Sequence, residues 1–155
     1  MTLFELLITI LISSILLLSS VISYREFMLK NQLNYNINKI VGMLHYAQSL
    51  AINSKNSIMV APAESDWQNG FVITDINHQK IFRTYSAISK QFTLTFRSSL
   101  GDNHFIEWQA DGFTFGQQGS FLLCNTKNTH QSAKITILRT GHVQSELQNG
   151  IGCHS

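Results

Sequence analysis

The sequence predicts an α+β fold in which a long N-terminal helix, membrane-spanning in its first half, packs on an antiparallel β-sheet domain. An uncharged apolar run near the chain start, an apolar stripe with helical spacing after it, and short strand-like runs in the remaining chain all predict this fold. We divide the 155-residue chain into a transmembrane helix of residues 1–25 and an α+β domain of residues 26–155.

Composition limits the class of protein. With 44% hydrophobic and 13% charged residues, the chain can form one globular domain with a core and one additional element. The formal net charge of +2 is too small for the overall field to indicate a nucleic acid or an anionic membrane as partner. Such binding would have to come from a local patch.

The apolar run covers residues 6–24 and contains no charged residue, Pro or Gly. Its helix would be about 28 Å long, which is enough to cross the hydrocarbon core of a bilayer. No basic segment precedes the run and no small-residue cleavage site follows it, so a secretory signal peptide is disfavoured. The run therefore predicts a single membrane span.

Glu5 lies at the edge of this run. A carboxylate that enters the bilayer costs roughly 2.5–3.5 kcal/mol, so a cation should accompany it. No Lys or Arg precedes Arg25, which leaves an α-amino group, its own or that of a neighbouring chain, as the nearest cation. The alternative is that Glu5 is solvated among lipid headgroups, and the spacing alone does not decide between the two.

The flanking charges give an unexpected topology. Arg25 and Lys30 follow the span and nothing basic precedes it, so the positive-inside rule would place the main domain in the cytoplasm. Cys124 and Cys153, the only cysteines, instead fit a disulfide in an oxidising compartment. Removal of a basic leader before residue 1 resolves this conflict.

The helix is predicted to continue to about Asn53. Gly42 lies within this helix, where its cost indicates a close approach by a strand or a neighbouring subunit, or a glycine that is tolerated without a role. The stripe that should face a sheet recurs at spacings of three and four: Leu33, Ile37, Ile40, Leu44, Ala47 and Ala51. After it, the sequence predicts seven strands at residues 57–61, 70–74, 80–85, 91–97, 104–108, 120–124 and 134–139.

The start of the chain resembles the mature N-terminus of type IV pilins and type II secretion pseudopilins. The resemblance rests on residues 1–5, Met-Thr-Leu-Phe-Glu, followed at once by the apolar helix. In that class a prepilin peptidase removes a basic leader and methylates the new terminus, here Met1, and Glu5 pairs with the amine of an adjacent subunit. The chain departs from the class at Met1, where Phe is usual, and lacks the Pro common near position 22 of major pilins.

The C-terminal region narrows the resemblance. Residues 105–143 resemble the closing region of the FimT/FimU minor pilins and the related GspH pseudopilins. The features that carry it are Asp111-Gly112, Gly119, an apolar strand that ends in Cys124, and Arg139-Thr140-Gly141. The resemblance implies a pilin-like fold and an assembly role in a filament.

Cys124 and Cys153 would then close a loop over the last predicted strand and tie down the tail. Metal binding with His130, His142 and His154 is the rival interpretation, and a reactive thiol next to His154 is another. The sequence has no two-cysteine knuckle and no regular His spacing, so we expect the disulfide and no metal or other cofactor. We also expect no enzyme activity, because no nucleophile motif, phosphate loop or metalloprotease helix is present.

DNA binding is the alternative function. FimT-type members are implicated in DNA capture during natural transformation through a basic motif similar to Gly-Arg-x-Arg. Residues 141–144 of this chain read Gly-His-Val-Gln and lack both arginines. The candidate DNA contacts that remain are Lys134, Arg139 and His142, with Lys127 nearby.

The resemblance implies a minor pilin or pseudopilin that primes or caps assembly of a type IV pilus or a type II secretion pseudopilus. The subunit would be held in the bacterial inner membrane by a single span with a periplasmic domain, and would then lie near the filament tip. Its partners would be other minor and major pilins or pseudopilins, the prepilin peptidase and the inner membrane. The closing motif and the cysteine pair favour the pilus.

Overall fold

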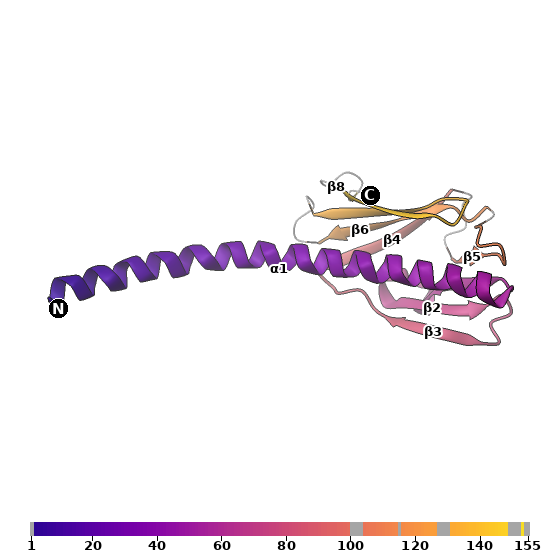
Figure 1. The fold of residues 1–155 in the computed structure, drawn as a ribbon, viewed down its shortest axis with the longest axis horizontal. Coiled ribbons are helices and arrows are strands. Elements are labelled where there is room, and N and C mark those ends of the chain that lie inside the picture. Colours follow the sequence, from indigo (N-terminus) through magenta and orange to yellow (C-terminus); the bar gives the residue numbers. More distant parts are fainter. Residues whose placement is uncertain (1, 100–103, 115, 127–130, 149–152, 154–155) are drawn as a thin grey trace. The chain divides into compact units, whose positions relative to one another are not determined.

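The computed structural model describes residues 2–99, 104–114, 116–126, 131–148 and 153, and the side chains of residues 18–23 lie outside the description (Figure 1). The chain divides into two units, Met1–Asn34 and Tyr35–Ser155. One helix, α1 (Leu3–Ser54), contributes to both. The expected α+β class, a long helix with antiparallel strands, is confirmed.

The first unit consists of the start of α1. Its described apolar side chains are exposed from Leu3 to Leu17. Residues 18–23 of the expected span lie outside the described side chains. Among the residues that are described, we find no helical segment that is both long and apolar enough to cross a membrane.

The second unit contains two four-stranded antiparallel sheets (Figure 1). The first sheet has the strand order β3-β2-β1-β5 and the second has the order β4-β6-β7-β8. The bounds of the first are β1 (Ile58–Pro62), β2 (Gly70–Asp75), β3 (Ile81–Ser86) and β5 (Ile106–Trp108). Those of the second are β4 (Phe92–Ser98), β6 (Gly119–Asn125), β7 (Ser132–Ile137) and β8 (Val143–Gln148).

The seven predicted strands are present, with ends that differ by a few residues. The prediction missed β8, because only Val143 of this edge strand is buried and its remaining residues lack an apolar alternation. The stripe on α1 is covered by two sheets instead of one. Alternation shows which residues of a strand point inward, but it does not show which strands pair with each other.

The core of the second unit forms around the C-terminal part of α1, which ends at Ser54 as predicted to within one residue. Ile40, Leu44 and Ala47 are fully buried, as their spacing predicts, and Met43 joins them. The inward residues of each sheet alternate with outward ones, as in the burial pattern of β4. The helix stripe and the inner faces of both sheets therefore form one apolar interior.

An aromatic cluster connects the two sheets. Trp67 belongs to the short helix η2 (Trp67–Asn69), which follows η1 (Ala63–Ser65), and its ring lies 5.0 Å from the ring of Phe121 in an edge-to-face arrangement. Phe71 of the first sheet and Phe96 of the second also contact Trp67. The next residue, Gln68, accepts a hydrogen bond from the Leu94 amide and donates one to the Phe92 carbonyl, so its side chain pairs with the outer edge of β4.

Two glycine turns close the domain against α1. At Gly141, which has a φ of 78°, a Cβ would lie 2.1 Å from the Gly112 carbonyl oxygen and 2.5 Å from Gln48 Nε2. The Gln48 amide donates to that same carbonyl at 3.1 Å. The Thr114 hydroxyl donates to the Leu138 carbonyl at 2.9 Å and joins the two turns. Asp111-Gly112 and Gly141, which carried part of the family resemblance, thus form one packed unit on the helix.

Gly42 has the opposite environment. The expected close approach of a strand is wrong, because a Cβ at Gly42 would meet nothing within 4 Å. Approach by a neighbouring subunit stays a prediction.

We predict opposite effects for two Gly→Ala changes. Gly141→Ala should lower the free energy of unfolding by about 3 kcal/mol, because it strains a left-handed residue and a backbone carbonyl blocks the new methyl group. Gly42→Ala, the matched control, should raise it by about 1 kcal/mol through helix propensity. Urea unfolding of the full chain in detergent measures both. A Gly141→Ala protein as stable as the parent would contradict the packing of the two turns.

Candidate functional sites

The first candidate site is the start of α1. The Thr2 amide donates to the Glu5 carboxylate at 2.9 Å, and the Glu5 amide donates to the Thr2 hydroxyl at 3.3 Å. This reciprocal pair is a capping box, which gives the Thr2 amide a partner and supplements the 3.1 Å hydrogen bond from the Glu5 amide to the Thr2 carbonyl. The apolar run around Glu5 predicted only an amine or solvent as its partner. The spacing of Thr2 and Glu5 is the signal that could have predicted the cap.

The Glu5 carboxylate is therefore engaged within its own chain. A carboxylate has two oxygens with several acceptor sites, so one contact leaves room for a second donor. Met1, the expected processing site, lies outside the described residues. The expected pairing of Glu5 with an amine stays a prediction.

The second candidate site is the outer face of the second sheet. One row of paired residues crosses β4, β6, β7 and β8 as Arg97, Ser120, Thr136 and Gln144. The adjacent row reads Thr95, Leu122, Lys134 and Glu146. Because alternate strand residues share a face, the outward side chains of both rows lie on one surface.

A shallow hollow of about 440 Å³ lies on this surface, and Arg97 and Lys134 both line it. Lys134 was a predicted contact, whereas Arg97 was not. The signal available at Arg97 was its place in β4, where Phe96 points inward and Arg97 must therefore point outward.

The two other candidate DNA contacts lie elsewhere. Arg139 and His142 belong to the turn between β7 and β8, where the Leu138 amide donates to the His142 carbonyl. The Arg139 carbonyl accepts a hydrogen bond from the Thr114 amide at 3.0 Å. Neither residue lines the hollow. Lys127 lies outside the described residues. Lys134 thus lines the hollow together with Arg97, whereas Arg139 and His142 lie in the turn that follows β7.

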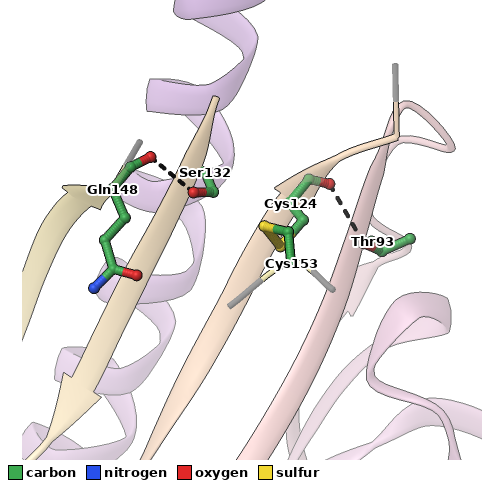
Figure 2. Close-up of a disulfide and its surroundings, with 5 residues drawn as sticks. All are labelled: Thr93, Cys124, Ser132, Gln148 and Cys153. Atoms are coloured by element: carbon green, nitrogen blue, oxygen red, sulfur yellow. Dashed lines mark hydrogen bonds between the residues drawn. A yellow bond between two sulfur atoms is a disulfide. The ribbon is translucent and has the colours of Figure 1, made fainter. Parts of the chain in front are cut away.

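Cys124 and Cys153 form a disulfide, as expected, with their Cα atoms 5.9 Å apart. Figure 2 shows hydrogen bonds around it. The Thr93 hydroxyl donates to the Cys124 carbonyl, and the Ser132 hydroxyl donates to the Gln148 carbonyl at 2.7 Å (Figure 2). Cys124 lies four residues after Ser120 on β6, and residues at an even separation in a strand share a face. The disulfide therefore attaches the tail on the same outer face as the hollow.

The metal alternative receives no support within the described part of the chain, where no three His, Cys, Asp or Glu side chains lie together as a metal site requires. His142 is exposed at its turn. His130 and His154 lie outside the described residues.

The chain was compared with known proteins. Residues 36–141 match the family model described as GspH, type II transport protein GspH. The comparison with curated proteins finds no significant match. The fold is similar to that of the type IV minor pilin FimU of Pseudomonas aeruginosa, with a TM-score of 0.66, 21% identity, and coverage of 77% of this chain and 92% of that chain.

The fold is also similar to that of the minor pseudopilin EpsH from the type 2 secretion system of Vibrio cholerae. The TM-score is 0.59 at 9% identity, with coverage of 75% of this chain and 97% of that chain. At these identities the two solved structures support the fold, and the family model supports the family.

The disulfide gives a prediction of stability. The crosslink spans a sequence separation of 29 residues. Cys153→Ser should lower the free energy of unfolding by about 3.5 kcal/mol, because the crosslink restricts the unfolded chain. Urea unfolding measures the loss, and a reductant should reproduce it in the parent but leave the Cys153→Ser variant unchanged. A loss below about 1 kcal/mol would mean that the hydrogen bonds of β8 suffice to hold the tail.

Proposed function

Because this chain belongs to the GspH family of type IV pilin-like minor pilins and pseudopilins, we propose that it primes or caps assembly of a filament. In this role its N-terminal helix joins the filament core and its α+β domain faces outward. Members of this family are structural subunits, so the chain is not an enzyme.

The observation that carries the proposal is the apolar surface at the start of α1. Large apolar side chains are exposed at consecutive positions such as Leu6, Leu7 and Ile8, and again at Ile15, Leu16 and Leu17. A helix that is apolar all round is stable only when it is buried, in lipid or among other helices. The proposed function provides both environments, because the subunit lies first in the inner membrane and then in the filament.

Maturation follows from the same proposal. A prepilin peptidase would remove a basic leader, leave Met1 as the new terminus and methylate it. The subunit would be held by one span in the inner membrane with its domain in the periplasm, which is consistent with the disulfide between Cys124 and Cys153. Its partners would be other minor and major pilins or pseudopilins.

Glu5 has two roles in this proposal. In the separate subunit it caps its own helix through the Thr2 amide. In the filament its remaining acceptor sites would bind the terminal amine of an adjacent subunit, which compensates the charge in an apolar environment and sets the register between helices.

We place the subunit in a type IV pilus in preference to a type II secretion pseudopilus. The closing turns at Gly112 and Gly141 and the disulfide-bound tail are the basis of this assignment.

DNA uptake is the second candidate function, and the geometry favours it less. Of the three candidate contacts only Lys134 lines the hollow, whereas Arg139 and His142 lie in the turn after β7. Gly141, which occupies the glycine position of the family's basic motif, serves packing against Gly112. The two cations that line the hollow together are Arg97 and Lys134.

Two substitutions separate the roles of Glu5. Glu5→Gln keeps a capping-box residue but removes the charge, whereas Glu5→Ala removes both. If charge pairing sets the register, both variants should reduce incorporation into filaments more than tenfold. The amount of the subunit in sheared filaments, relative to its amount in membranes, measures incorporation.

A Glu5→Gln variant that assembles normally while Glu5→Ala fails would restrict the role of Glu5 to the helix cap. Normal assembly of both would contradict any role of Glu5 in assembly. Urea unfolding of the variants should be unchanged apart from the loss of the cap, about 1 kcal/mol in Glu5→Ala.

A further inference from the structure

The hollow on the second sheet has the features of a small-molecule site. It lies over β4, β6 and β7, and its volume of about 440 Å³ is within the range of ligand pockets in proteins, roughly 300–1,000 Å³. That volume suits one or two sugar rings or a similarly compact group. We propose that this hollow binds a uronate residue of an acidic polysaccharide, a function beyond assembly.

Two cations give the hollow its charge preference. Arg97 on β4 and Lys134 on β7 are two strands apart and offset by two residues along the strand direction, so their Cα atoms lie about 12 Å from each other. Long side chains at this distance reach a common centre from opposite sides. Neither cation has an ion-pair or hydrogen-bond partner among the residues that the structure describes. Both therefore remain available for an anionic ligand.

The ligand is better described as a carboxylate than as a phosphate chain. A guanidinium presents its donors in a planar fork that matches a carboxylate, and a lysine adds a point charge. Binding along DNA commonly uses six to ten phosphate contacts, whereas two cations account for a salt slope of only about −1.8. Arg139 and His142, which could extend such a track, do not line the hollow.

The rest of the lining favours a sugar over a bare anion. Three hydroxyl side chains and one amide also line the hollow: Ser99, Ser120, Thr136 and Gln118. Such groups both donate and accept hydrogen bonds, as the hydroxyl groups of a sugar require. Leu138, whose side chain is exposed, adds apolar surface for the face of a sugar ring. A phosphate ion would use the cations and leave most of these groups without a role.

Glu146 allows a second test of the preference of the hollow for an anionic ligand. It is paired in register with Lys134 across β7 and β8 and is exposed on the same face, but it does not line the hollow. Its carboxylate offsets part of the positive field without contacting the ligand. Glu146→Gln should therefore strengthen binding.

The experiment titrates the full chain in detergent with trigalacturonate by calorimetry. Four further probes are tested in the same way: the neutral galactose trimer, inorganic phosphate, a 12-base-pair DNA duplex and detergent alone. We expect trigalacturonate to bind with a Kd below about 1 mM and the neutral trimer to bind at least tenfold more weakly.

Variants assign the binding to the hollow. Arg97→Gln and Lys134→Gln should each weaken trigalacturonate binding at least fivefold, and Glu146→Gln should strengthen it up to threefold. Lys90→Gln, which removes an exposed positive charge just before β4, is the matched control and should leave binding unchanged. Unchanged urea unfolding of each variant separates a lost contact from a lost fold.

Four results would overturn the proposal. They are absence of trigalacturonate binding at 10 mM, equal binding of the neutral trimer, phosphate binding as tight as that of trigalacturonate, and an effect of Lys90→Gln equal to that of Arg97→Gln. DNA binding that is tighter than trigalacturonate binding and is lost in Arg97→Gln and Lys134→Gln would also overturn it, and would assign the hollow to DNA uptake.

Discussion

The structure of the α+β domain depends on burial of one stripe along the C-terminal part of α1. Ile40, Met43 and Leu44 fill the space between the inner faces of the sheets, and full burial of such side chains stabilises by about 1.5–3 kcal/mol each. Farther along, the buried positions are the small residues Ala47 and Ala51. At that end the backbone of the glycine turns reaches the helix, where Gln48 donates to the Gly112 carbonyl. The large residues of the stripe thus pack among side chains of the sheets, whereas the small residues allow the backbone of the turns to approach the helix.

The two parts of α1 meet opposite physical requirements. The second part is amphipathic and finds its partner within the chain, whereas the first part exposes apolar side chains that only another molecule can cover. The capping box formed by Thr2 and Glu5 starts this first part without using any group from the domain. The exposed apolar side chains at the start of α1 are therefore available for lipid or for neighbouring helices.

Most elements could be predicted from the sequence because local pattern encodes them. The end of α1 and seven strands follow from helical spacing, alternation and turn residues, and alternation in β4 placed Phe92, Leu94 and Phe96 in the core. Pairing is not local, so the division into two sheets and the edge strand β8 could not be predicted in the same way. The role of Gly42 was misjudged within the subunit because the cost of a helical glycine does not reveal what approaches it.

The candidate sites also differ in whether local sequence spacing or strand pairing brings their residues together. Thr2 and Glu5 are three residues apart, so their hydrogen bonds are encoded by spacing, and the disulfide was predictable because the chain has no other cysteines. Arg97 and Lys134 are far apart in the sequence and share a surface only because β6 pairs with β4 on one side and with β7 on the other. Inward residues of these strands are constrained by the core, so their outward neighbours can change without loss of the fold. Chemistry specific to this chain is therefore expected on the outer face, where register determines which side chains meet.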